Sequence, residues 1–274
     1  MATTGMTPPT PRSNHYDDEE ELSTMSLVDH LEELRWRIFK CLIAVVVGAI
    51  VAFIFRDQIM DFLKGPLPAL SAGMGSIKGP AHGGKPLYVL GLTEGLTVQL
   101  LLAAVVGCVA ALPIILYQTW AFVAPGLYRH EKRNAVPFIF IGIVLFGIGT
   151  SLGYMVLRFP VQWLIEFQAN SFEQLITADS YFKFVAIFML IFGLIFELPL
   201  VLAFLARIGI VTVEGLQRKR PVAHVSMWVA SVFIAPGGDI YSPLILGTIM
   251  SFLYELTIIF IKIFIKPDPD VDTV

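Results

Sequence analysis

The feature that most constrains this chain is a series of six long apolar stretches. We place them at residues 38–55, 95–123, 135–157, 184–206, 221–236 and 243–262. A helix needs about 20 apolar residues to cross the ~30 Å hydrocarbon core of a bilayer. The second, third and fourth stretches satisfy that requirement comfortably. The sequence therefore predicts an all-α polytopic membrane protein with six transmembrane helices.

The composition supports this interpretation, because 56% of the residues are hydrophobic, only 15% are charged and the mean hydropathy is +0.74. A water-soluble chain cannot hide that much apolar surface, and the balance also argues against a disordered chain, a coiled coil or a secreted disulfide scaffold. The formal net charge of −3 gives no basic surface for nucleic acid. We expect the lipid bilayer to surround most of the chain.

The last two apolar stretches differ from the others. The fifth contains only sixteen or so residues, which reach about 24 Å as a helix. Pro236, Gly237 and Gly238 then turn the chain back toward the sixth stretch. We expect the last two helices to be short and to form a hairpin that thins the bilayer locally or meets it obliquely.

Three regions differ in composition along the chain. Residues 1–25 are rich in Pro, Thr and acidic residues and predict a disordered extension. Order is expected to begin at Ser26, a plausible N-cap with Asp29 three residues later. We therefore divide the chain into residues 1–25, a membrane domain at 26–266 and a tail at 267–274.

The lysines and arginines predict the orientation in the membrane. If the N-terminus is cytoplasmic, thirteen of the nineteen lie on the cytoplasmic side and six on the other. The positive-inside rule then places both termini in the cytoplasm, together with the loops around 124–134 and 207–220. The long loops 56–94 and 158–183 are expected to face outward.

Two segments match catalytic motifs only superficially. Gly79, Gly84 and Lys85 fit the start of a phosphate-binding loop, but Pro86 follows where a Ser or Thr must hold magnesium, and no strand precedes the segment. The G-x-S-x-G pattern at residues 149–153 lies inside the third apolar stretch and not at a strand-to-helix elbow. We interpret its two glycines as a site of close helix packing.

Other enzymatic chemistry has equally little support. An intramembrane serine protease would need a histidine base, and His224 is the only histidine inside an apolar stretch. The sequence has no HExxH, no CxxC and no carboxylate cluster with metal-ligand spacing. We therefore expect no enzyme activity, no metal and no cofactor.

Two acidic residues lie within apolar stretches. Glu197 falls in the fourth, close before Pro199, and a charge at mid-membrane costs about 2.5–3.5 kcal/mol on insertion scales. An interhelical hydrogen bond and a functional polar contact are both open for it. Glu255 is late in the sixth stretch, where packing or snorkelling toward the boundary is the simpler interpretation.

Two further acidic residues lie at the expected cytoplasmic surface. Glu33 can pair with Arg37 one helical turn later, a contact that contributes only a few tenths of a kcal/mol. Glu131 is surrounded by basic residues in YRHEKRN, which suits a solvated and self-neutralised loop. From these residues alone, a proton-coupled secondary transporter also stays open, although the two halves show no internal repeat of the kind such carriers contain.

Five segments together resemble the TatC family, the core receptor component of the twin-arginine protein translocase. They are HLEELRWRI (30–38), LPIILYQTWAFVAPGLYRHEKR (112–133), FGLIFELP (192–199), RKRP (218–221) and APGGD (235–239). The similarity extends over essentially all of residues 26–266. It favours a translocase component over the transporter alternative.

The resemblance implies a receptor and not an enzyme. TatC-like proteins bind signal peptides with two consecutive arginines on folded cargo. They gather single-span TatA-type and TatB-type partners, so that cargo crosses the bacterial cytoplasmic membrane at the expense of the proton-motive force. The resemblance also implies a concave six-helix bundle, with several copies in a larger complex. A carboxylate suits this task because it binds a guanidinium in a bidentate pair that lysine cannot form.

Carried over residue by residue, the resemblance also implies functional positions. The residues expected to bind the signal peptide are Glu33, Arg35, Phe122, Pro125 and Glu131. The residues expected to make intramembrane polar contacts, with a partner helix or the deeper part of the signal, are Glu197 and Glu255. Pro66 matches the family's proline after the first span. Asp239 matches an outward-facing aspartate, although the chain reads PGGD where a second proline is common.

Overall fold

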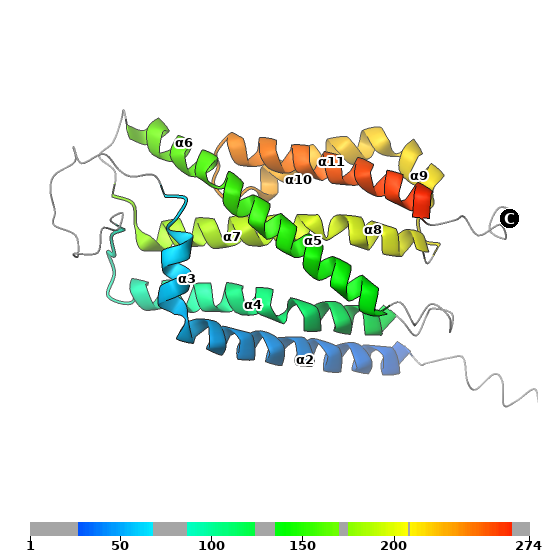
Figure 1. The fold of residues 1–274 in the computed structure, drawn as a ribbon, viewed down its shortest axis with the longest axis horizontal. Helices are drawn as coiled ribbons and strands as arrows, with labels where there is room; N and C mark the ends of the chain where they lie inside the picture. The colour runs from blue at the N-terminus through cyan, green and yellow to red at the C-terminus, as the bar shows by residue number, and fades with distance from the viewer. Residues whose placement is uncertain (1–26, 68–86, 124–134, 170–174, 208, 265–274) are drawn as a thin grey trace, which may run out of the picture.

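The computed structural model describes residues 27–67, 87–123, 135–169, 175–207 and 209–264. Within this part the chain forms ten helices and one isolated backbone bridge, between Tyr88 and Thr177. Most of the helices run side by side along the long axis of the bundle, while α5 crosses them obliquely (Figure 1). The predicted all-α fold is confirmed.

Helix α2 (Leu27–Ile54) packs along α4 (Glu94–Val123) at one side of the bundle (Figure 1). The two backbones touch where Gly48 faces Gly107. A Cβ atom added to Gly107 would lie 2.4 Å from the backbone nitrogen of Ala49 and 2.8 Å from the carbonyl oxygen of Val45. The absence of a side chain at Gly107 therefore lets α2 and α4 approach this closely.

Helix α5 (Ala135–Val156) packs against α7 (Ala178–Phe196) through small residues. A Cβ atom at Gly149 would lie 2.7 Å from the carbonyl oxygen of Phe192, and one at Gly153 would lie 2.8 Å from the Phe192 Cβ. The prediction that these two glycines serve close helix packing is confirmed. The G-x-S-x-G pattern is therefore a packing surface of α5.

Helix α7 is followed at once by α8 (Leu198–Arg207), and Glu197 lies at the break between them. Proline has no backbone N–H, so Pro199 cannot donate the bond to residue 195 that a continuous helix requires. Two residues earlier, at the break, the Glu197 N–H donates to the Leu194 carbonyl, three residues back, at 3.1 Å. The two helices together form one segment, Ala178–Arg207, that is long and apolar enough to cross a membrane.

The last part of the chain consists of α9 (Val213–Arg218), α10 (Arg220–Ile234) and α11 (Tyr241–Phe264). Helices α10 and α11 form the predicted hairpin, and Gly238 adopts a φ of +62° in the turn between them. Helix α10 is short, with 15 residues. Helix α11 has 24 residues, so the expectation that both final helices are short is wrong for the last one.

Two segments expected to be outward loops contain helices. The loop 56–94 begins with α3 (Arg56–Leu63), and the loop 158–183 begins with α6 (Arg158–Ala169) and ends with the first residues of α7. Both α3 and α6 mix polar and apolar residues, so neither reads as an apolar stretch. A stretch chosen for its run of apolar residues does not give the full length of a helix, which explains the difference.

Five segments of the described part are long and apolar enough to cross a membrane: His30–Ile54, Glu94–Phe122, Pro137–Phe167, Ala178–Arg207 and Tyr241–Ile263. Helix α7 supplies the centre of the core, where Phe182, Phe188 and Phe192 are fully buried. Many large apolar side chains remain exposed on the outside, most of all along α2. A lipid environment is the solvent that such a surface requires.

The helix termini divide between two ends of the bundle. At one end α2 and α5 begin and α4, α8 and α11 end (Figure 1). At the other end lie α3, α6 and the start of α7. The first and the last helix of the described part therefore meet the same end of the bundle.

Candidate functional site

A polar cluster joins α2 to α4 at the end of the bundle where α2 begins. The Arg37 guanidinium donates from Nε to Glu33 Oε1 at 3.0 Å and from Nη1 to Gln118 Oε1 at 3.2 Å. The predicted ion pair between Glu33 and Arg37 is confirmed. Gln118 is 9% exposed, so one helix presents the ion pair and the other presents a buried amide acceptor.

An aromatic contact closes the same cluster. The rings of His30 and Phe122 stack with centroids 4.4 Å apart and planes inclined by 15°. His30 Nδ1 lies 3.7 Å from Glu33 Oε2, which is buried and has no hydrogen-bond partner among the described residues. His30 therefore links Phe122, near the end of α4, to Glu33 on α2, and the roles of Glu33 and Phe122 in signal binding stay predictions.

A groove of about 320 Å³ runs from this cluster along α2 and α4. Arg37, Gln118 and Phe122 line its polar end, and Ile38, Leu34, Cys41, Leu42, Val45 and Thr119 line the rest. Its walls are therefore charged at one end and apolar beyond it. The apolar part of such a groove can hold an apolar segment, whereas Glu33, the carboxylate that could accept a cationic group, is paired with the lining residue Arg37 and is not itself part of the lining.

The structure does not bring every predicted signal-binding residue into this cluster. Arg35 is exposed, and it lies two residues from Glu33, on roughly the opposite face of α2. Pro125 and Glu131 lie outside the described residues, in the segment between the end of α4 and the start of α5. Their roles, and that of Arg35, stay predictions.

Glu197 is buried, with 8% of its surface exposed. Neither carboxylate oxygen has a hydrogen-bond partner among the described residues. Its Oε2 faces α5, where a Cβ atom on Gly142 would approach it to 3.3 Å. The interhelical hydrogen bond considered for Glu197 is therefore not formed within the described part of the chain, and the carboxylate keeps its full capacity to accept one.

Glu255 makes contacts within the final hairpin. Arg220 Nη2 lies 2.8 Å from its Oε2, and His224 Nε2 lies 3.1 Å from its Oε1. The cluster ties α11 to the start of α10, which agrees with the packing interpretation. The same contact engages His224 with a carboxylate and not with a serine.

The two other family-matched residues lie next to the ends of helices. Pro66 lies in the turn that follows α3 and is partly exposed. Asp239 is 4% exposed, and its Oδ1 accepts from the Ser242 backbone N–H at 2.6 Å, in the first turn of α11. The Ser242 hydroxyl also donates to Asp239. Asp239 therefore caps α11 in the manner of an N-cap acid.

Glu94 is a connecting residue that the sequence analysis missed. Its Oε2 accepts from the backbone N–H groups of Leu90 and Gly91 at 2.7 and 3.0 Å, and its Oε1 accepts from that of Asp179 at 3.2 Å. It joins the start of α4 to the start of α7. Its position next to an apolar stretch is the only sequence signal that could have singled it out.

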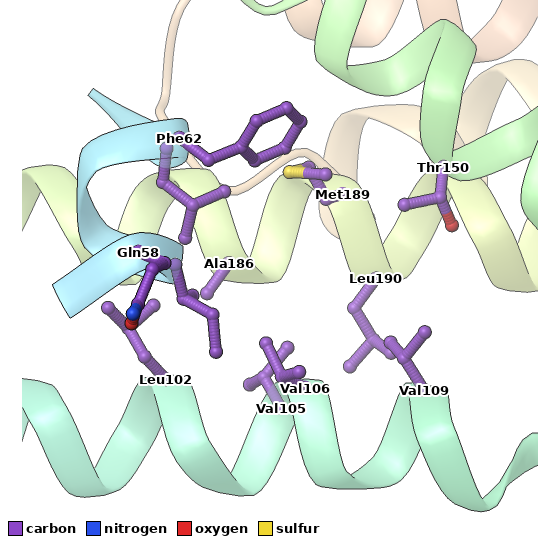
Figure 2. A pocket seen from close by; sticks show the side chains of 12 residues that line it. Gln58, Phe62, Leu102, Val105, Val106, Val109, Thr150, Ala186, Met189 and Leu190 are labelled. Carbon is purple, nitrogen blue, oxygen red and sulfur yellow. The ribbon is translucent and has the colours of Figure 1, made fainter. Parts of the chain in front are cut away.

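An apolar cavity of about 350 Å³ lies at the other end of the bundle, between α3, α4, α5 and α7 (Figure 2). Phe62 from α3, Val105 and Val109 from α4 and Met189 from α7 are among the residues that line it. Thr150 contributes a buried hydroxyl with no partner among the described residues. No group of three or more His, Cys, Asp or Glu side chains suited to a metal occurs in the described part of the chain.

A family model described as "Sec-independent protein translocase protein (TatC)" matches residues 29–248. The chain belongs to the TatC family. A relative from Desulforapulum autotrophicum is 35% identical over 90% of this chain and 87% of its own length, and one from Carboxydothermus hydrogenoformans is 34% identical over 89% and 95%. Both are named Sec-independent protein translocase protein TatC.

A solved structure described as the twin arginine translocase receptor TatC agrees with this fold. It superposes with a TM-score of 0.70 and 31% identity over 85% of this chain and 98% of that chain. The chain is therefore a component of the Sec-independent protein translocase, a multi-pass inner-membrane protein and not an enzyme. These similarities give the proton-coupled transporter alternative no support.

Proposed function

We propose that this TatC-family protein binds the twin-arginine signal peptides of folded cargo at the end of the bundle where α2 begins. Glu33 is the acceptor for one signal arginine, and Glu131 is the acceptor for the other. Arg35, Phe122 and Pro125 contribute to the same surface. The signal's apolar segment follows along a concave wall of the helices.

The observation that carries this proposal is the cluster of Glu33, His30 and Phe122 beside an apolar groove whose lining includes Phe122 and Arg37. A signal peptide of this class presents arginine first and apolar residues afterwards, which matches the Glu33 carboxylate near the start of α2 and the apolar lining of the groove further along α2. Helix α4 ends at Val123, so the segment that contains Glu131 starts from this end of the bundle. Hydrogen bonds to a charged partner contribute about 1.5–3 kcal/mol each, enough for two carboxylates to select two arginines.

The orientation that we propose places this end of the bundle, with both termini, in the cytoplasm, and six helices in or across the membrane. Basic residues in the described part favour it: Arg35, Arg37, Lys40, Arg207, Arg218, Lys219, Arg220 and Lys262 lie toward this end, and Arg56, Lys64, Arg158 and Lys183 lie toward the other. An excess of cations marks the cytoplasmic side.

We assign the recruitment of single-span TatA-type and TatB-type partners to the embedded acid Glu197. A buried carboxylate without a hydrogen-bond partner is costly, and a polar group from a partner helix would offset that cost. Several copies of the chain then assemble with these partners in one complex, and the proton-motive force drives the transport. Replacement of Glu197 by Leu should remove copurification of such partners, and unchanged copurification would refute this contact.

The direct test of the signal site is photocrosslinking. A twin-arginine peptide with a photoreactive residue is added to membranes that contain the wild-type chain, the double variant Glu33→Ala plus Glu131→Ala, or the control Glu32→Ala, which removes an exposed acid next to Glu33. We expect crosslinking to fall only in the double variant. Undiminished crosslinking there would overturn the assignment.

A further inference from the structure

The Glu33 carboxylate already holds a guanidinium in this structure. Arg37 donates to its Oε1 from both Nε and Nη2 and reaches Gln118 with its third nitrogen. The side chains of Arg37 and Glu33 are 19% and 25% exposed, so water screens the pair only in part. The charge of Glu33 is therefore compensated before any ligand arrives.

This arrangement limits how a second guanidinium can bind. A bidentate pair needs both carboxylate oxygens, and Arg37 engages Oε1. The other oxygen, Oε2, is buried and has no hydrogen-bond partner among the described residues. An external arginine can form the full pair only if Arg37 leaves Glu33.

We infer that Arg37 is an internal competitor that occupies the place of a signal arginine on Glu33 and is displaced when the signal peptide binds. The inference rests on the proposed function, because it takes Glu33 as a signal-binding residue. The bond from Arg37 to Gln118 is independent of Glu33. Arg37 therefore keeps one acceptor on α4 after displacement.

An internal competitor sets a threshold for binding. The apparent affinity of any ligand falls by the fraction of molecules in which the site is open. A twin-arginine peptide overcomes this threshold because each of its arginines can form a bidentate pair. A lysine-substituted peptide gains only a single-point contact and does not overcome the threshold. Arg37 thereby lowers the apparent affinity of the receptor for every peptide, and only a peptide that binds Glu33 strongly enough displaces it.

The test is a titration of a fluorescently labelled twin-arginine peptide against the full chain in lipid nanodiscs. The variants are Arg37→Gln, Arg37→Lys, Glu33→Gln and the double variant Glu33→Gln plus Arg37→Gln. The charge-matched control is Lys40→Gln, which removes one exposed cation three residues after Arg37 on the same helix. Thermal unfolding of each variant separates a binding effect from loss of the fold.

We expect Arg37→Gln to bind the peptide about fivefold more tightly, which corresponds to loss of one partly exposed ion pair. Arg37→Lys, whose charge remains but whose contact is weaker, should show a smaller gain and provides the measurement if Arg37→Gln does not fold. Lys40→Gln should match the wild type. Glu33→Gln should weaken binding, and the double variant should show no gain over Glu33→Gln.

Each other result has a distinct meaning. Unchanged or weaker binding by Arg37→Gln, with weaker binding by Glu33→Gln, overturns the inference and leaves the proposed function in place. A gain that persists in the double variant also overturns it, because the gain would not depend on Glu33. If neither single variant changes binding, the proposed signal site fails, and the inference fails with it.

Discussion

Gly107 controls how closely α2 and α4 can pack, and Gly107→Ala should separate them. The added Cβ would lie 2.4 Å from Ala49 N and 2.7 Å from Ala49 Cα, against 3.4–4 Å for ordinary contact. Both contacts are with backbone, so no side chain can rotate away. Helix α2 must shift by roughly 1 Å, and overpacking of this kind costs about 1–3 kcal/mol.

The matched control is Gly147→Ala, because Gly147 lies within α5 and an added Cβ there meets nothing within 4 Å. Both substitutions gain the same helix propensity, about 1 kcal/mol, so the comparison isolates the contact. Thermal unfolding in detergent, followed by tryptophan fluorescence, should show Gly107→Ala to be less stable than Gly147→Ala by about 1–3 kcal/mol. Equal stability of the two variants would refute the reasoning.

Three further predictions concern contacts outside the signal site. Glu94→Ala should speed hydrogen exchange of the Leu90, Gly91 and Asp179 amides, because the three charge-assisted hydrogen bonds that they donate to the carboxylate are lost; unchanged exchange would contradict this role. Tyr181→Phe removes the 2.8 Å bond from its hydroxyl to the Leu63 carbonyl, and should lower the unfolding midpoint by an amount equivalent to about 1 kcal/mol. Asp239→Ala removes both bonds from Ser242, and should lower stability by about 0.5–2 kcal/mol while Asp239→Asn retains most of it; equal losses would argue against capping.

Much of the fold could be predicted from sequence because lipid imposes a simple length rule. Apolar stretches located the spanning segments, although they predict a single helix for the fourth stretch and do not predict the break between α7 and α8 at Glu197. The rule fails where a helix mixes polar and apolar residues, which is why α3 and α6 were assigned to loops. The apolar stretch at 243–262 also stops short of both ends of α11, which runs from Tyr241 to Phe264.

The candidate site could be predicted only in part. The ion pair of Glu33 with Arg37 follows from spacing along one helix, and it is present. The contact of Arg37 with Gln118 joins residues 81 positions apart, and no local pattern indicates it. Phe122 was predicted through the family resemblance, whereas its stacking on His30 emerged only from the packing of α2 against α4.

The sequence by itself determined three properties of this chain. It is a membrane protein, most of its helices can be located along the chain, and it is similar to the TatC family. These properties depend on composition, length and order along the chain. The tertiary structure decided which faces of the helices meet, and with them the contacts of Arg37 with Gln118, of Glu94 with Asp179 and of Glu255 with Arg220. The physical reason is that lipid is as apolar as the interior of the bundle. A spanning helix is therefore apolar on every side, and its sequence periodicity does not reveal which side faces protein.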